Sequence, residues 1–289
     1  MLLPPDLRSR LDRLSLSTRG RVQALWAGGH ASVRKGESLD FADYRPYVPG
    51  DDFRKIDHNL WARLGQVLIR QYEAEEELPL RLVIDASASM SLHGKHDTAV
   101  RLAAVVAYLT LASGDRVQPS VTPGPDGRAA LNGPVGRHSS TWPQLERWLE
   151  SLVPAGQAPL TPAVRSLIGG SPTRGPLVLI SDLFDDEWER ALDSLSVAAG
   201  GIVFHVLGSQ ELDPHVSGDL RLRDIETGNE IDVSTSAETL RLYRTELERF
   251  VEAAAGRAKR AGLDYLLVEA GPSAAETALT ALLASGAVR

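Results

Sequence analysis

The chain has 289 residues, of which 43% are hydrophobic and 24% charged, a composition typical of a folded globular protein of one or two domains. Acidic residues outnumber basic ones by 38 to 31, and the resulting net charge of -7 argues against a broad nucleic-acid-binding surface. The absence of cysteine excludes disulfides, thiolate zinc sites and cysteine nucleophiles.

The beginning of the chain shows no apolar core and no cleavage pattern of a secretory signal. The longest apolar stretch, residues 102–112, is much shorter than the roughly 20 residues that cross a bilayer. We therefore expect a cytoplasmic protein with no membrane span.

The first 79 residues mix helical and irregular patterns. Leucines at positions 7, 11 and 14 have the spacing of one helical face, and a second helix is expected to end at Gly28 and Gly29. Residues 31–50 are rich in proline, glycine and aromatic residues and are predicted to be irregular. Asp51 or Asp52 is then expected to cap a short helix ending near residue 63, followed by a strand over residues 64–75.

From residue 80 onward, short apolar runs alternate with helical patterns. The runs LRLVID, PLVLIS and GIVFHVL have the composition of strands buried on both faces. Strands are expected at 80–85, 117–121, 129–131, 176–181 and 201–207, with helices at 96–112, 142–152, 161–168 and 187–198. This alternation predicts an α/β fold, a doubly wound and mostly parallel sheet covered by helices on both faces.

The last 81 residues begin with a predicted hairpin. Strands at 220–225 and 230–233 flank the turn Thr227-Gly228-Asn229. A long helix at 237–261, a strand at 265–271 and a helix at 274–284 follow. We therefore expect an N-terminal segment, residues 1–79, that packs on the sheet. A sheet domain, residues 80–208, and a C-terminal extension, residues 209–289, that completes the same domain follow it.

The most informative motif is Asp85-Ala86-Ser87-Ala88-Ser89, at the carboxyl end of the first buried strand. Open α/β sheets bind ligands outside the carboxyl ends of their strands. One carboxylate and two hydroxyls supply hard oxygen donors that suit Mg²⁺ or Mn²⁺. The same residues could instead form a small turn in which Asp85 caps backbone amides.

Two further residues favour the metal hypothesis. Asp182 follows the buried strand PLVLIS, and Thr161 lies at a helix start, where it could equally be a simple N-cap. Asp85, Ser87, Ser89, Thr161 and Asp182 together supply two carboxylates and three hydroxyls at one edge of one sheet. In type and order they resemble the metal-ion-dependent adhesion site of von Willebrand factor type A domains. The resemblance implies that the hydroxyls ligate Mg²⁺, that the aspartates bind it directly or through waters, and that one position stays open for a partner's carboxylate.

A second block narrows the family. Residues 41–57, FADYRPYVPGDDFRKID, continue through Trp61-Ala62-Arg63 to VLIRQYE at residues 67–73. This block looks like the signature of the bacterial domain-of-unknown-function family 58, and the hairpin Asp224-x-Glu226-Thr227-Gly228 is similar to that family as well. The resemblance implies a von Willebrand-like domain and, as partners, a MoxR-type AAA+ ATPase and an unknown target protein complex.

Four arginines of this block, Arg45, Arg54, Arg63 and Arg70, have two interpretations. They could pair with Asp43, Asp51, Asp57 and Glu73 in a structural scaffold. They could instead form a docking surface for acidic groups of a partner.

Three functional hypotheses remain open at this stage. The leading one is a non-enzymatic, Mg²⁺-dependent protein-interaction module, an adaptor or co-chaperone of the ATPase. The sequence has no phosphate-binding loop, so any ATP-driven motion would come from the partner. The second is a Mg²⁺-dependent phosphoester hydrolase with Asp185, Asp186 or His96 as general base. The third is a scaffold without metal.

Overall fold

The computed structural model describes residues 1–18, 41–48, 56–72, 79–124, 128–157, 160–169, 175–198, 200–277 and 280. The chain divides into two compact units, and the smaller unit is inserted in the sequence of the larger one. The larger unit comprises residues 1–33 and 78–289, and the smaller comprises residues 34–77.

The larger unit is built on a six-stranded sheet with the order β10-β7-β6-β3-β4-β5. Every neighbouring pair from β10 to β4 is parallel, and only β5 runs antiparallel to its neighbour. The strands are β3 (Leu80–Asp85), β4 (Val117–Thr122), β5 (Leu131–Asn132), β6 (Leu177–Ser181), β7 (Gly201–Leu207) and β10 (Asp264–Glu269). The mostly parallel α/β sheet predicted from the sequence is therefore confirmed.

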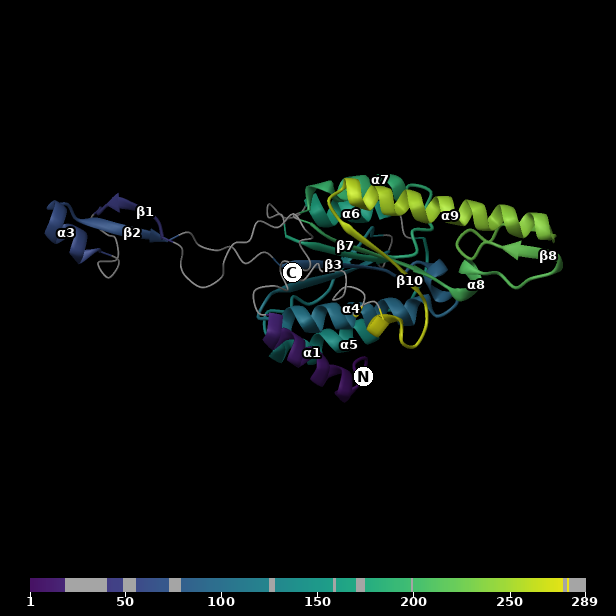
Figure 1. Cartoon of the computed structure of the whole chain (residues 1–289), viewed down its shortest axis with the longest axis horizontal. Coiled ribbons are helices and arrows are strands. Elements are labelled where there is room, and N and C mark those ends of the chain that lie inside the picture. Colours follow the sequence, from purple (N-terminus) through teal and green to yellow (C-terminus); the bar gives the residue numbers. More distant parts are fainter. Residues whose placement is uncertain are drawn as a thin grey trace. The chain divides into compact units, whose positions relative to one another are not determined.

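Helices cover both faces of this sheet (Figure 1). On one face lie α1 (Pro5–Thr18), α4 (Lys95–Ala112) and α5 (Trp142–Glu150), and on the other α6 (Leu160–Gly169), α7 (Trp188–Ser194) and α9 (Ala237–Arg260). Short 3₁₀ helices are η3 (Ala88–Ser91), η5 (Ser139–Thr141) and η6 (Leu195–Val197). In the described part of the chain, none of the helices has both the length and the apolar character that a membrane span requires.

The core follows the two-residue period of the strands. Leu82 and Ile84 of β3 face the α4 side, whereas Val83 between them faces the α6 and α7 side. Because successive side chains of a strand point to opposite faces, a strand covered on both sides must be apolar at nearly every position. Leu7 and Leu11, two of the three leucines that the sequence places on one helical face, extend the first core together with Leu3, so α1 packs on the sheet unit.

The residue bounds of the hairpin and of the long helix in the C-terminal region are close to the predicted ones. Strands β8 (Gly218–Arg223) and β9 (Glu230–Thr235) form an antiparallel pair, and the short helix α8 (Ser209–Leu212) precedes them. Strand β10 returns to the main sheet beside β7. The helix predicted at 274–284 begins at residues 274–277, and most of its remainder lies outside the described residues.

The smaller unit differs from its predicted structure. Residues 41–46, predicted to be irregular, form strand β1 (Phe41–Pro46), which pairs antiparallel with β2 (Leu68–Tyr72). The prolines that suggested a loop do not interrupt the strand, because Pro46 is its last residue, where a missing amide costs little.

Helix α3 (His58–Leu64) begins later than expected. Its N-cap is Asp57, whose carboxylate accepts a hydrogen bond from the Leu60 backbone N–H at 3.1 Å. The predicted caps Asp51 and Asp52, and the second predicted helix ending at Gly28, lie outside the described residues.

Candidate metal centre

The candidate site lies where two central strands end. Strands β3 and β6 are parallel neighbours, so the residues at their carboxyl ends meet at one edge of the sheet. Asp85 ends β3, and Asp182 directly follows β6. Both carboxylates are almost completely buried, with 2% and 1% of their surfaces exposed.

The loop after β3 brings a carboxylate and two hydroxyls together. Asp85 Oδ1 accepts a hydrogen bond from the Ser87 backbone N–H at 2.9 Å. Ser87 Oγ and Ser89 Oγ are 2.9 Å apart and share a hydrogen bond. The backbone N–H of Ala88 donates to the Gly156 carbonyl at 2.8 Å, which anchors the loop to a neighbouring segment. The arrangement therefore has features of both expected roles: Asp85 caps the turn, and the serine hydroxyls converge.

The loop after β6 is held in a strained conformation. Ser181 Oγ donates to Asp85 Oδ2 at 2.6 Å and accepts from the Leu183 backbone N–H at 2.9 Å, which links the two strand ends directly. Leu183 has a φ of 57°, a left-handed conformation that costs a non-glycine residue of the order of 1–3 kcal/mol. Asp182 Oδ1 accepts from the Phe184 backbone N–H at 3.1 Å.

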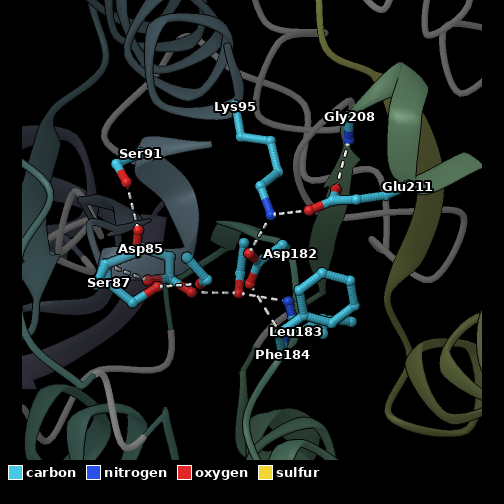
Figure 2. A network of polar contacts seen from close by, with 12 residues as sticks. Asp85, Ser87, Ser91, Lys95, Asp182, Leu183, Phe184, Gly208 and Glu211 are labelled. Atoms are coloured by element: carbon cyan, nitrogen blue, oxygen red, sulfur yellow. Dashed lines mark hydrogen bonds and ion pairs between the residues drawn. The ribbon is translucent and has the colours of Figure 1, made fainter. Parts of the chain in front are cut away.

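A buried lysine at the start of α4 also reaches this edge of the sheet (Figure 2). Lys95, the first residue of α4, has no exposed surface, and its ammonium group donates to Asp182 Oδ2 at 2.8 Å and to Glu211 Oε1 at 2.5 Å. Glu211, in α8, also accepts the Gly208 backbone N–H at 2.7 Å. The carboxyl ends of β3, β6 and β7 thus contribute to one polar network.

His205 of β7 supports the loop of Asp182 from beneath. Its Nε2 donates to the Asp182 carbonyl at 2.9 Å, because a carbonyl can only accept, and its Nδ1 accepts from the Tyr265 hydroxyl at 2.6 Å. Burial lowers the pKa of His205 to about 4, so the ring is neutral at pH 7 and holds this one tautomer.

The charge of Asp182 affects the ionisation of Asp85. Burial, and then the charge of Asp182, raise the pKa of Asp85 to about 7, although hydrogen bonds from Ser181 and Ser87 oppose the rise. Among the described residues, the network contains three acidic side chains, Asp85, Asp182 and Glu211. Its cation is the ammonium group of Lys95, which contacts Asp182 and Glu211. Negative charge therefore exceeds positive charge in a region with little water, a condition that a bound cation would relieve.

Thr161 lies on the first turn of α6 and is also buried, with 3% of its surface exposed. Its hydroxyl donates to the Glu187 carbonyl at 3.1 Å, and the neighbouring Leu160 backbone N–H donates to Asp185 Oδ2 at 2.6 Å. Both contacts tie the start of α6 to the loop that follows Asp182. The structure thus brings Asp85, Ser87, Ser89 and Asp182 together, and attaches Thr161 to this group through the loop and not through the serines.

Two of the three residues considered as general bases, Asp185 and His96, make hydrogen bonds within the protein, and the third, Asp186, is exposed. Asp185 accepts backbone N–H groups on both oxygens, from Leu160 and from Glu187. His96 contacts the Leu152 carbonyl through Nε2 at 3.0 Å. These contacts make both residues parts of the loop and helix packing.

The predicted docking arginines belong to the smaller unit. Arg45 lies in β1 opposite Ile69, and Arg70 lies in β2 opposite Tyr44. Arg63 is exposed near the end of α3, and Arg54 lies outside the described residues. Of their expected acidic partners, Asp57 is buried and caps α3.

The donor set at the sheet edge depends on hydroxyls. Within the described ranges, no three His, Cys, Asp or Glu side chains are arranged to hold a metal ion by themselves. The buried set of Asp85, Ser87, Ser89 and Asp182 consists of oxygen donors, which fits Mg²⁺ better than zinc or copper, because Mg²⁺ needs few protein ligands and retains waters.

Sequence reasoning missed four members of the network, Lys95, Ser181, His205 and Glu211. The rule that identified Asp85 and Asp182 applies equally to the carboxyl end of β7, and extending it would have indicated Glu211 four residues later. Lys95 carries a weaker signal, a single cation at the start of an otherwise apolar helix.

Comparison with known proteins identifies the family to which the chain belongs. The family described as "Protein of unknown function DUF58" matches residues 43–259, three quarters of the chain. The chain belongs to this family. The match runs from the β1 signature to the end of α9, so it includes the sheet edge and the C-terminal hairpin.

Curated relatives match a similar share of the chain. "Uncharacterized protein Rv1480" and "Uncharacterized protein MT1527" of Mycobacterium tuberculosis are each 28% identical over 232 residues, covering 78% of this chain and 72% of the relative. The "conserved hypothetical protein BatB" of Bacteroides thetaiotaomicron, a solved structure, is 18% identical with a TM-score of 0.45, covering 72% of this chain and 98% of its own.

Proposed function

We propose that this DUF58 protein is a non-enzymatic protein-interaction module whose sheet edge is a von Willebrand-like, metal-ion-dependent adhesion site. In this proposal the site binds Mg²⁺ or Mn²⁺, and the ion recognises a carboxylate of a partner. The partner class is a MoxR-type AAA+ ATPase, for which the chain serves as adaptor or co-chaperone toward a target complex.

One observation carries the proposal. Asp85 and Asp182 lie buried at adjacent strand ends, next to the paired hydroxyls of Ser87 and Ser89. Burying two carboxylates this close is costly, as the raised pKa of Asp85 reflects, unless a cation accompanies them. Lys95 already divides its ammonium between Asp182 and Glu211, so it does not compensate Asp85.

Each residue then has a defined role. Ser87 and Ser89 would hold the ion with Asp85 and Asp182, while Thr161 would reach it from the start of α6. Ser181, Lys95 and His205 fix the orientation of the two aspartates through the hydrogen bonds described above. The bound ion would supply a fixed positive charge at the surface of the sheet edge, which attracts an acidic side chain of the partner.

The support for the ATPase partner is the family resemblance, together with the lack of a phosphate-binding loop in the sequence. Arg63 is exposed and meets one requirement of a second contact with an acidic surface. In the proposal, Arg45, Arg54, Arg63 and Arg70 position the partner while the metal captures its carboxylate.

The test is affinity capture from the native lysate with the wild type, Asp182→Asn and Ser89→Ala, in Mg²⁺ and in EDTA. Retention of an AAA+ ATPase only by the wild type in Mg²⁺ is expected. The exposed control Arg249→Ala should capture as well as the wild type. Retention of the ATPase by every variant and in EDTA would contradict a metal-bridged interface, and no retained ATPase under any condition would contradict the adaptor role.

A further inference from the structure

The hairpin of β8 and β9 has an unusual pattern of burial. Between Arg221 and Asp232 every residue is exposed except Glu226, although the same stretch contains Leu222, Ile225 and Ile231, which are 49%, 43% and 63% exposed. Proteins usually bury apolar residues and expose glutamates, and this hairpin does the opposite. Some contact other than hydrophobic packing must therefore hold Glu226.

The turn that carries Glu226 is tightly built by its neighbour Asp224. Asp224 Oδ1 accepts the Glu226 backbone N–H at 2.9 Å, and its other oxygen accepts the Thr227 hydroxyl. The Asp224 carbonyl accepts the Gly228 backbone N–H at 2.9 Å, and Gly228 has a φ of 74°, which suits glycine. The direction of the Glu226 side chain is thus set by the turn.

The Glu226 carboxylate is directed at the candidate metal centre. It faces the hydroxyl and backbone N–H of Ser89, both of which act to lower its pKa, and it lies within reach of the charge of Asp182. Burial outweighs these donors and raises its pKa. Its Oε1 atom is enclosed and has no hydrogen-bond partner in the described structure.

This placement adds a third carboxylate to the buried pair of Asp85 and Asp182. Like charges at short range repel, and an enclosed carboxylate oxygen without a donor adds a desolvation cost. The ammonium of Lys95 is bonded to Asp182 and Glu211, so it does not serve Glu226. A divalent ion beside Ser89 would satisfy the free oxygen and remove the repulsion.

We infer that Glu226 is an internal ligand of the site: its carboxylate takes, from within the chain, the coordination position that a partner's carboxylate would use. The inference rests on the proposed function. The hairpin is then an autoinhibitory element that must leave the sheet edge before an acidic partner can bind the ion.

The decisive experiment measures Mn²⁺ affinity and hairpin position in the same set of variants. Glu226→Gln removes the charge and keeps the shape, and Glu230→Gln is the matched control, an exposed glutamate of the same hairpin. Mn²⁺ binding is followed by titration calorimetry, with Asp182→Asn and Ser89→Ala as site variants. The chain has no cysteine, so spin labels at Ile231→Cys and Ser166→Cys, both exposed, report the distance from the hairpin to α6 by pulsed electron resonance.

The expected result is that Glu226→Gln weakens Mn²⁺ binding at least about tenfold and broadens the label distance distribution, while Glu230→Gln matches the wild type in both. If the wild type binds Mn²⁺, the site variants lose it and Glu226→Gln binds like the wild type, the internal ligand is refuted and the metal centre stands. If the wild type binds no Mn²⁺, both ideas fail. Weakened binding with an unchanged distance distribution would overturn the autoinhibitory role, because the hairpin would be held by other contacts.

Discussion

The interior of the sheet buries apolar side chains, whereas its carboxyl edge buries charged ones. In the interior, Leu82, Val83 and Phe204 are almost fully buried in two apolar cores. At the edge, where β3 and β6 end, Asp85 and Asp182 are equally buried. Burial of the interior stabilises the fold by about 25 cal/mol for each Å² of apolar surface. Burial of the edge destabilises the fold, because the charged groups lose their contacts with water.

This difference separates the part of the sheet whose burial stabilises the fold from the part whose burial opposes folding. An apolar edge would fold at least as well, since replacing buried charges by apolar residues of similar size is often neutral or stabilising. The strained Leu183 lies at the same edge. Strained residues and buried charges of this kind cluster at binding and catalytic sites.

The largest expected effect is in the interior. Phe204→Ala leaves a cavity between β7 and the helices on the α4 face, and we expect the free energy of unfolding to fall by about 4 kcal/mol. Urea denaturation measures it. Mn²⁺ affinity of the folded fraction should not change, and a loss of affinity would show that the two regions are not separable.

A loss of about 3 kcal/mol is expected from Lys95→Met at the edge, because the change leaves the buried carboxylate of Asp182 and the largely buried carboxylate of Glu211 without their cation. The double variant Lys95→Met with Asp182→Asn separates charge from packing. If stranded charge is the cause, Asp182→Asn costs less in the Lys95→Met background than in the wild type. Equal costs in both backgrounds would assign the loss to packing.

The pH dependence of stability gives an intermediate effect. The pKa of His205 is about 4 in the folded chain and about 6.5 in the unfolded chain, so the unfolded state binds more protons as the pH falls below 6.5. The ring therefore destabilises the fold by about 2 kcal/mol between pH 7 and pH 5. The measurement is the difference in unfolding free energy between wild type and His205→Phe at the two pH values. This difference isolates the ring because both chains share Asp85, whose raised pKa acts in the opposite direction. A difference that does not change with pH would contradict a buried, neutral His205.

The smallest effect is expected on the surface. Arg249 and Glu246 form an exposed ion pair on α9, so Arg249→Ala should change the unfolding free energy by at most about 0.5 kcal/mol. Thermal melts in low and high salt measure it. A change as large as that of Lys95→Met would remove the distinction between buried and exposed charge on which the comparison depends.

Much of this contrast is visible in the sequence. Runs such as LRLVID predict strands buried on both faces, and the topology rule for parallel sheets then places Asp85 and Asp182 at one edge. Periodicity does not reveal which distant residues reach that edge. Lys95 and Glu211 meet across 116 positions, and Glu226 approaches Ser89 only because a hairpin folds back. Strand β1 was missed because its pairing with β2 outweighs its turn-like composition.

Helix α9 is packed against the rest of the protein mainly at one end. Its only buried residues are Ala254 and Ala258, near its C-terminal end, while Leu242 near the other end is 61% exposed. From Ala237 to Ala254 the helix extends about 26 Å, so a tilt of about 10° at the packed end displaces the far end by about 4–5 Å. Tyr243 and Arg244 on that arm bond the Glu211 carbonyl and the Asp213 carboxylate, at 2.6 and 2.7 Å. Because these bonds join the exposed end of α9 to Glu211 and Asp213, a tilt of the helix would move the segment whose Glu211 carboxylate binds Lys95.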